Sequence, residues 1–449
     1  MPDVVVVGAG IMGASIALEL QRAGWSTVVL DKGDAVGGGS TSASSAVVRF
    51  GFSTEPGVVA AWESKHRWEA WVDHLGLPES GTAAGPLARF HRTGMLFLEP
   101  AGFPRGLYLG LLDDVGVPYE LFDTPGLAER FPSLDLGRFW PPHRPHDESF
   151  FDGPDGSLDG WFTPDAGFID DPQLAARNLM DAAVRQGTEV RLRTPVVGVA
   201  VTGDRVAGVE IADGSRLDAP VVVNAAGPWS SKLNRLAGVE ADMAVTTRPL
   251  RQEVHTAGAP AGFSFEDGGT VLGDLDLGYY CVPRPDGTIL AGGVEADCDP
   301  LEWVDDPDEV SPLPTAELFE AQVWRMARRV PGLAVPHRPT GLAGVYDVTQ
   351  DWLPIYDRTS LDGFYLAVGT SGNQFKNAPL VGQAMAELIG ACESGHNHDT
   401  DPVRVGCHLI GRSLDLGAFS RNRTGSVTSG TVLGSVSYTH LTLPTILLV

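Results

Sequence analysis

The chain of 449 residues is poor in cysteine and in long apolar runs, and each shortage excludes a class of protein. Its four cysteines lie far apart and form no C-x-x-C pair, which argues against a disulfide framework or a zinc site and favours a reducing cytoplasm. No apolar run is long enough for a membrane-spanning helix, so we expect no membrane span. Because the first strand begins near residue 3, we also expect no signal peptide.

Positive charge is scarce as well. Lysine and arginine together number 32 against 57 acidic residues, which gives a formal net charge of −25. This balance disfavours nucleic acids and anionic membrane surfaces as partners. Only four lysines occur, so a lysine beside a glycine-rich loop, such as Lys376, attracts attention.

The opening residues carry the most informative pattern. Val4–Val7 predict a buried strand, and Gly8, Gly10 and Gly13 follow at G-x-G-x-x-G spacing, before a helical stretch and a second strand that ends at Asp31. The glycines suit a tight turn, close approach of a diphosphate and close helix–strand packing. The helix N-terminus attracts the diphosphate, and the Asp31 carboxylate suits ribose hydroxyls but disfavours NADP. The pattern predicts dinucleotide binding and leaves FAD and NAD open.

Other polar clusters have plainer interpretations. His143, His146 and Asp147 could be drawn as a metal site, but surface polarity explains them better, and we predict no metal. The acidic stretch Asp305–Glu309 is expected to be a solvated loop. Residues 436–449 contain a segment that resembles a translated transposase sequencing adapter, so we treat them as a non-native scar; the alternative is a genuine apolar tail.

Three stretches together resemble one family. They are Val4–Gly13 with Asp31, the segment VVVNAAGPW at 221–229, and the segment GFYLAVGTSGNQFKNAPLVG at 363–382, with a weaker fourth at 344–358. In this order they resemble the FAD-dependent D-amino-acid oxidase superfamily, particularly its sarcosine oxidase, glycine oxidase and dimethylglycine dehydrogenase branch. The resemblance covers the chain to about residue 423.

The resemblance implies an α/β fold, with a Rossmann-like FAD-binding domain assembled from three segments and a substrate domain on a large mixed β-sheet. The expected ranges are 1–85, 163–232 and 336–415 for the FAD-binding domain and 86–162 and 233–335 for the substrate domain. Residues 416–435 form a C-terminal tail.

Cofactor residues follow from the same resemblance. Gly8, Gly10 and Gly13 would face the diphosphate and Asp31 the ribose; Gly39, Ser40, Thr41 and Ser42 would hold the diphosphate and the flavin edge; Val197, Gly227 and Trp229 would lie at the adenine side; Gly372, Asn373, Gln374 and Lys376 would lie by the flavin ring. The family's flavin-linking histidine is absent from the loop, and its linking cysteine falls at about Gly344, so FAD should be non-covalent.

For the substrate, the resemblance places Arg49 and Lys376 where family members grip a carboxylate, and a fixed cationic pair suits that task. The alternative for Arg49 is a surface ion pair. Tyr279 or Tyr280 would face the pocket, unless both only pack in the sheet. Arg251 and Gln252 are further candidates for that wall.

The implied activity is an FAD-dependent oxidoreductase in amino-acid catabolism, which takes a hydride from the carbon next to the nitrogen of an amino acid or N-methyl amine to give an imine. Two alternatives stay open: a flavin dehydrogenase of a hydroxy acid or glycerol-3-phosphate-like substrate, and a flavin-binding subunit of a multi-subunit sarcosine oxidase-like complex. The electron acceptor, oxygen or a redox carrier, also stays open. An oxygen-activating lysine of the family is replaced by Leu290, which leans toward a dehydrogenase, and a histidine beside the flavin is replaced by Asn373.

Overall fold

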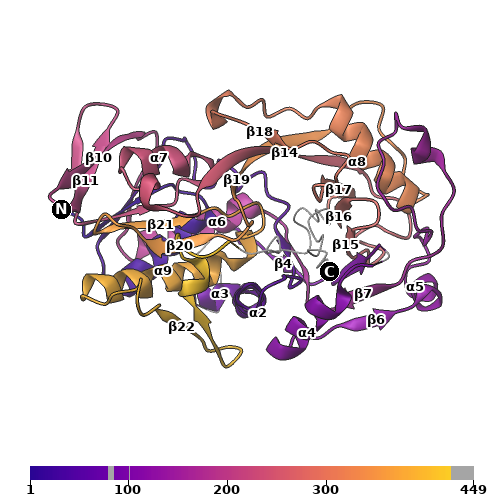
Figure 1. Ribbon diagram of the computed structural model, residues 1–449, viewed down its shortest axis with the longest axis horizontal. Coiled ribbons are helices and arrows are strands. Elements are labelled where there is room, and N and C mark those ends of the chain that lie inside the picture. Colours follow the sequence, from indigo (N-terminus) through magenta and orange to yellow (C-terminus); the bar gives the residue numbers. More distant parts are fainter. Residues whose placement is uncertain (79–84, 101, 426–449) are drawn as a thin grey trace, which may run out of the picture.

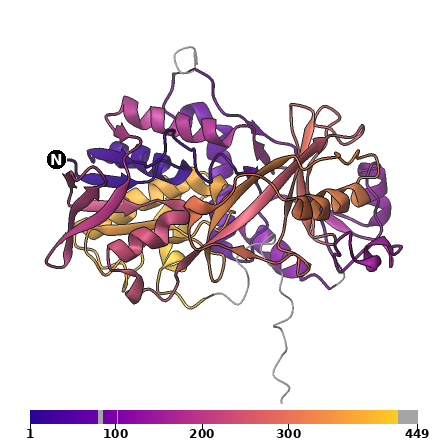
Figure 2. The same cartoon turned by 90° about the horizontal axis from the view of Figure 1, so that it is seen from above.

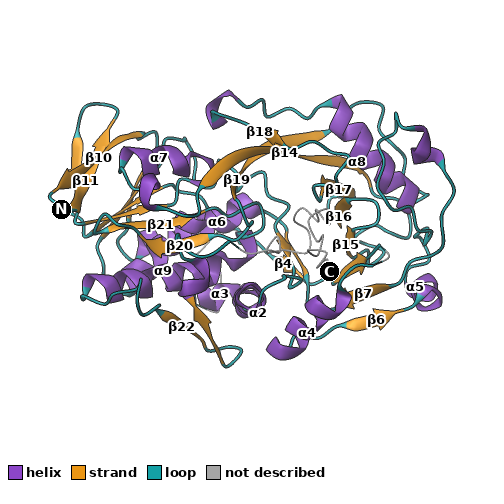
Figure 3. Ribbon diagram, viewed as in Figure 1, coloured by secondary structure: helices purple, strands orange, loops and turns teal. Residues whose placement is uncertain are grey.

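The computed structural model describes residues 1–78, 85–100 and 102–425, and it divides into two parts built on two large sheets (Figures 1 and 3). Residues 426–435 of the expected tail and the expected scar at 436–449 lie outside the described residues. Within the described ranges, no helix combines the length and the apolar character needed to cross a membrane.

The first sheet has six strands in the order β20-β21-β13-β1-β2-β9. All pairings in it are parallel except that of β20 with β21. The strands are β1 (Val4–Val7), β2 (Thr27–Leu30), β9 (Glu189–Arg191), β13 (Val221–Asn224), β20 (Ile355–Arg358) and β21 (Phe364–Val368). They come from three separated stretches of the chain, as the sequence predicts for the Rossmann-like domain.

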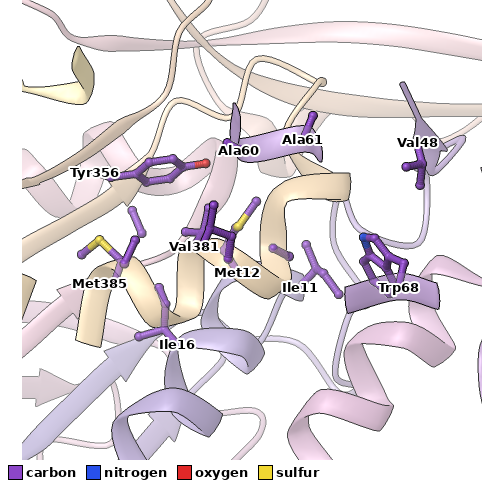
Figure 4. Packing of buried hydrophobic residues seen from close by; sticks show 14 of the residues in the cluster. Ile11, Met12, Ile16, Val48, Ala60, Ala61, Trp68, Tyr356, Val381 and Met385 are labelled. Atoms are coloured by element: carbon purple, nitrogen blue, oxygen red, sulfur yellow. The ribbon is translucent and has the colours of Figure 1, made fainter. Parts of the chain in front are cut away.

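Both faces of this sheet are covered, which explains why β1 is apolar throughout. Val4 and Val6 pack in one cluster with the helices α1 (Ile11–Arg22), α6 (Pro172–Arg185) and α9 (Ala378–Glu393). Figure 4 shows Ile16 of α1 beside Met385 of α9 in this cluster.

Val5 and Val7 pack on the opposite face, against a three-stranded antiparallel sheet. Its strands are β10 (Val196–Thr202), β11 (Arg205–Ile211) and β12 (Arg216–Asp218). The layers are therefore helices, parallel sheet and small antiparallel sheet.

The second sheet has nine strands in the order β18-β14-β17-β16-β15-β5-β7-β6, with β19 also paired to β14. It is mixed, because β15 pairs parallel with β5 while its other pairings are antiparallel. The strands are β5 (Met95–Leu98), β6 (Glu120–Phe122), β7 (Gly160–Thr163), β14 (Thr247–Gly258), β15 (Val271–Asp274), β16 (Tyr279–Pro283), β17 (Thr288–Gly293), β18 (Glu302–Trp303) and β19 (Gly341–Thr349). The large mixed sheet predicted for the second domain is confirmed.

One strand of the second sheet comes from a range that we expected in the FAD-binding domain. β19 lies inside the range 336–415 that we expected in the FAD-binding domain, but it pairs with β14 from Gly341 to Thr349. Residues 341–349 therefore belong to the second sheet. Figures 1 and 2 show β14 running from the first part of the molecule into the second.

Smaller elements complete the fold. The remaining helices are α2 (Glu55–Glu69), α3 (Trp71–His74), α4 (Arg105–Val115), α5 (Thr124–Arg130), α7 (Ser230–Leu236) and α8 (Ala316–Arg329). The remaining strands are β3 (Val47–Val48), β4 (Phe90–His91) and β8 (Gly167–Ile169), which form a three-stranded sheet, and the hairpin β22 (Arg404–Cys407) with β23 (Arg412–Asp415).

A buried ion cluster fixes α8 to the second sheet. Arg329, at the end of α8, places Nε 2.6 Å from Asp274 Oδ2 and Nη2 2.9 Å from Asp276 Oδ2, and all three side chains are buried. The described part of the tail is held by similar chemistry, because Arg421 Nη1 lies 3.0 Å from the buried Asp357. Arg421 thus ties this part of the tail to the first sheet.

Candidate active site

A cavity of about 690 Å³ is lined by residues of both large sheets and of the loops between them. It brings together most of the residues that the sequence singles out: Gly8, Gly10, Asp31, Gly39, Ser40, Thr41, Arg49, Gly227, Trp229, Tyr280, Gly372, Asn373, Gln374 and Lys376. Of the other candidates, Gly13, Ser42, Val197 and Tyr279 lie outside its lining.

The three glycines of the first turn have two different roles, backbone packing and space for a ligand. Gly8 has φ +115°, and a Cβ there would lie 2.2 Å from the Ala225 carbonyl oxygen. A Cβ on Gly13 would lie 1.9 Å from the Gly8 carbonyl oxygen, so Gly13 packs the helix onto the turn, behind the cavity. A Cβ on Gly10 meets only the Thr41 hydroxyl oxygen, at 3.3 Å, and Gly10 faces the cavity. Gly8 and Gly13 therefore lack a side chain because the fold leaves no room for one. At Gly10 the missing side chain serves only to leave room for a ligand.

The carboxylate at the end of β2 is held rigidly. Asp31 Oδ2 accepts a hydrogen bond from the Ala9 backbone nitrogen at 2.6 Å, and Oδ1 accepts one from Gly33 at 2.7 Å. Since Asp31 also lines the cavity, the turn and the carboxylate form one preorganised wall.

Trp229 lies on the same side of the cavity. Its buried indole Nε1 has no hydrogen-bond partner within the described part of the chain, and a buried donor without a partner is costly. The Lys32 ammonium lies 3.9 Å from the centre of its ring. Val197, expected nearby, is half exposed, and Thr194, Pro195 and Val196 line the cavity in its place.

Most of the acidic stretch Asp305–Glu309 is exposed, as expected of a solvated loop, and two of its carboxylates also form ion pairs. Asp306 Oδ1 lies 2.6 Å from the Lys232 ammonium, and Asp308 pairs with Lys32. Lys32, Lys232 and Asp308 all line the cavity. The acidic loop of the second domain is therefore clasped to the first domain beside Trp229.

Two cations stand close together on another wall. Arg49 and Lys376 are each 3% exposed, and their charged ends lie 4.9 Å and 5.1 Å from the centre of the Phe52 ring. Arg49 Nη1 donates to the Gly51 carbonyl at 2.6 Å, and Lys376 Nζ donates to the Asn373 carbonyl. A surface location for Arg49 is thereby excluded.

Burial lowers the pKa values of both cations. It lowers the pKa of Arg49 to about 10, so the guanidinium stays charged at neutral pH. Burial and the neighbouring Arg49 charge hold the pKa of Lys376 well below its usual value.

The two tyrosines of β16 face opposite sides of the sheet, as neighbours in a strand must. Tyr280 lines the cavity, and its hydroxyl lies 2.5 Å from the Ser45 hydroxyl. Its ring packs against Gly292, where a Cβ would lie 2.5 Å from it. Tyr279 is fully buried in the apolar cluster on the other face. Tyr280 is therefore the tyrosine of the cavity.

Two residues that the sequence analysis did not single out also line the cavity. Tyr346 of β19 packs against Gly372, whose φ of +67° and missing Cβ allow the ring to approach. Glu295 follows β17, with φ +52°. The Gly292-Gly293 pair just before it was the available signal, since glycines often mark a close approach to a ligand.

The remaining candidates lie near this wall without lining it. Arg251 pairs with Glu253 at 2.6 Å and with Glu302 at 2.9 Å, whereas Gln252 donates to Glu295 Oε1 at 3.1 Å. Leu290 packs against the main apolar cluster.

Comparison with known proteins decides the family. Residues 3–388 match the model of the family described as FAD dependent oxidoreductase (DAO). The chain belongs to this family. It is therefore an FAD-dependent oxidoreductase of the D-amino-acid oxidase type, and the resemblance found in the sequence is confirmed.

Individual relatives of this DAO chain are distant. FAD-dependent oxidoreductase domain-containing protein 1 of Xenopus laevis is 26% identical, over 86% of this chain and 79% of the relative. Sarcosine oxidase subunit beta of Rhodobacter capsulatus is 22% identical, over 86% of this chain and 84% of its own length. The crystal structure of L-proline dehydrogenase from P. horikoshii shares the fold, with a TM-score of 0.69 at 23% identity, over 88% of this chain and 94% of that one.

The cavity of the DAO chain suits FAD by its own chemistry. It offers a glycine turn at a helix N-terminus for the diphosphate, a fixed carboxylate for ribose hydroxyls, and an indole N–H that lacks a partner among the described residues. Each of these groups suits a part of a dinucleotide, so the donor set fits the cofactor that the family requires.

Proposed function

We propose that the chain oxidises the carbon–nitrogen bond of an amino acid or N-methylated amino acid to an imine, which then hydrolyses in solution. The observation that carries the proposal is the pair of buried cations, Arg49 and Lys376, which meet over Phe52 on the cavity wall. The carboxylate of a small substrate can accept charge-assisted hydrogen bonds from both side chains.

The chain's own residues would bind and orient the substrate. Arg49, charged at neutral pH, anchors the carboxylate, and Lys376 adds a second nitrogen donor beside it. Tyr280 and Tyr346 add phenol groups to the same wall. Bound FAD supplies the hydride acceptor. Holding the substrate against it is the protein's main contribution to the rate.

For the cofactor we propose non-covalent binding. Gly8, Gly10, Gly39, Ser40 and Thr41 would hold the diphosphate, Asp31 the ribose, Gly227 and Trp229 the adenosine side, and Gly372, Asn373, Gln374 and Lys376 the flavin ring; Gly13, Ser42 and Val197 would act from behind this lining. At Gly344, where a linking cysteine would stand, a Cβ would lie only 2.9 Å from Ala43 Cβ.

The relatives support an amine substrate by the names they carry, since one is a sarcosine oxidase subunit and another an L-proline dehydrogenase. The likeness to a subunit, over 84% of its length, favours a second candidate in which the chain acts inside a multi-subunit complex. The four cysteines are free thiols, which supports the cytoplasm as its proposed location.

The test is the visible spectrum of FAD-loaded protein mixed without oxygen with glycine, sarcosine, proline and D-amino acids. Bleaching by one of them is expected, and admitting air then distinguishes an oxidase from a dehydrogenase. Bleaching by hydroxy acids alone would overturn the proposal, and bleaching only in the presence of copurifying subunits would favour the second candidate.

A variant pair tests the anchor. Arg49→Met should raise KM for the amino acid about 10- to 100-fold, because one charge-assisted hydrogen bond contributes about 1.5–3 kcal/mol. The control Arg404→Met removes an exposed cation of the β22–β23 hairpin and should change nothing. An unchanged KM in Arg49→Met would remove the carboxylate anchor from the site.

A further inference from the structure

Glu295 is an acid built into a wall that otherwise presents cations and phenols. It lines the cavity together with Arg49, Tyr280 and Tyr346. Its φ of +52° is a conformation that residues with a side chain rarely adopt, and such outliers gather at binding sites. The second sheet thus holds this carboxyl in a costly backbone conformation at the substrate end of the cavity.

Its neighbours do not neutralise it fully. Gln252 of β14 donates to Oε1 at 3.1 Å. Arg49, beyond β3, favours the ionised form, whereas burial and the charge of Asp299 disfavour it, and the balance raises the pKa of Glu295 to about 8. The phenols of Tyr280 on β16 and Tyr346 on β19 also feel its charge. When the cavity holds no substrate, the positive charge around Glu295 is therefore too small to keep its carboxyl ionised at neutral pH.

Another buried acid on the cavity wall shows the contrast. Asp347 has both oxygens engaged, because Oδ2 accepts from the Gly369 backbone nitrogen at 2.6 Å and Oδ1 from the Ser230 hydroxyl at 2.9 Å. Those bonds tie Asp347 to the fold. The described contacts of Glu295 leave it able to receive a cationic ligand.

We propose that Glu295 binds the ammonium group of the substrate and then accepts its proton, while Arg49 holds the carboxylate. This inference rests on the proposed function and names its substrate class: zwitterionic amino acids rather than simple carboxylic acids. One N–H bond of the ammonium breaks and its electron pair stays on nitrogen, while an O–H bond forms on Glu295. The neutral amine can then form the C=N bond as the hydride leaves carbon for FAD.

The raised pKa makes Glu295 suited to this transfer, since a carboxyl that titrates near 8 is a stronger base than an ordinary one. Arrival of the ammonium ionises Glu295 and sends its proton to solvent, and transfer from nitrogen then restores the neutral acid. Each bound zwitterion should therefore release close to one proton from Glu295 at pH 7.

Two unreactive probes of nearly the same shape provide the test. 2-Aminoisobutyrate is a zwitterion without an α-hydrogen, and pivalate carries a methyl group in place of its ammonium. We expect the FAD-loaded wild-type protein to bind 2-aminoisobutyrate at least tenfold more tightly than pivalate, as measured by perturbation of the flavin spectrum. In Glu295→Gln this preference should disappear, with the Kd for pivalate unchanged within threefold or lower.

Proton release in weakly buffered solution gives a second readout that a purely structural role would not move. Wild-type protein should release nearly one proton more with 2-aminoisobutyrate than with pivalate, and Glu295→Gln should show no such difference. Glu295→Asp keeps the charge and should retain part of the preference.

The outcomes separate the two proposals. A wild-type protein that binds neither probe would contradict the carboxylate anchor, and with it the proposed function. A wild-type protein that binds both probes equally, or a Glu295→Gln variant that keeps the preference and the proton release, would overturn the role of Glu295 alone.

Discussion

Replacing the glycines of the first turn one at a time should separate those that shape the backbone from the one that faces the cofactor. In Gly8→Ala the residue must keep φ near +115° and place Cβ 2.2 Å from a carbonyl oxygen. Backbone strain costs about 1–3 kcal/mol and overpacking a further 1–3 kcal/mol, so we expect a loss of about 2–6 kcal/mol. At about 2 °C per kcal/mol, the Tm of the apoprotein should fall by roughly 4–12 °C.

Gly10→Ala is the matched control. Gly10 has an ordinary φ of −70°, and its Cβ would meet only a hydroxyl oxygen at 3.3 Å, so the Tm of the apoprotein should change by less than about 2 °C. The added methyl group stands in the cavity, however, so the Kd for FAD should rise at least tenfold by fluorescence titration. Gly13→Ala should follow Gly8→Ala, because its Cβ would lie 1.9 Å from a backbone oxygen.

The refuting results differ between the variants. An apoprotein Tm for Gly8→Ala equal to that of the wild type would show that the turn can relax, against the geometry described. A Gly10→Ala protein that binds FAD as tightly as the wild type would show that the diphosphate does not approach this part of the turn.

For three other substitutions the structure predicts the direction of the change. Arg329→Leu leaves two buried aspartates without their cation and should lower the free energy of unfolding by about 3–5 kcal/mol in denaturant titration. The control Arg138→Leu removes an exposed ion pair and should lower it by less than about 1 kcal/mol. Equal losses in the two variants would contradict the role of the cluster. Because the pKa of Glu295 is raised by folding, its ionisation disfavours the folded state, so the Tm of wild-type apoprotein should fall relative to Glu295→Gln as pH rises from about 4.5 to about 8, and parallel Tm curves would refute this. Lys32→Met breaks the ion pair with Asp308 and should weaken FAD binding less than about fivefold while reducing its salt dependence, and a Kd with unchanged salt dependence would count against the clasp.

Local pattern was enough to predict the beginning of the first domain. The strand, glycine turn, helix and Asp31 follow one another within 31 residues, so their geometry is written in one continuous stretch. The helix α6 is another such case, since Asp171 caps it by accepting from the Leu174 nitrogen at 2.8 Å, directly before Pro172.

Features that depend on distant pairing were not predictable in this way. The pairing of β19 with the second sheet was not predicted, because its partner, β14, lies about 90 residues earlier in the chain. The ion pairs of the acidic loop were not predicted because Lys32, the partner of Asp308, is separated from it by 276 residues.

The cavity wall shows the same limit at the level of single residues. Tyr279 and Tyr280 are chemically identical, and only the phase of β16 within the sheet decides which one reaches the cavity. Glu295 belongs to no motif that we recognised, and its place follows from the left-handed turn after β17. The substrate assignments of Arg49 and Lys376 stay predictions until a ligand is measured.

The long strand β14 has a mechanical consequence. It begins beside the first domain, where the Thr247 and Ser230 hydroxyls lie 2.9 Å apart, and continues to Gly258 in the second sheet, braced by β19 along nine residue pairs. A paired strand of this length is rigid, so we expect much less movement between the two halves of the molecule than a flexible linker would allow. We therefore expect substrate exchange to need only small displacements at the cavity rim, so that turnover responds weakly to solvent viscosity.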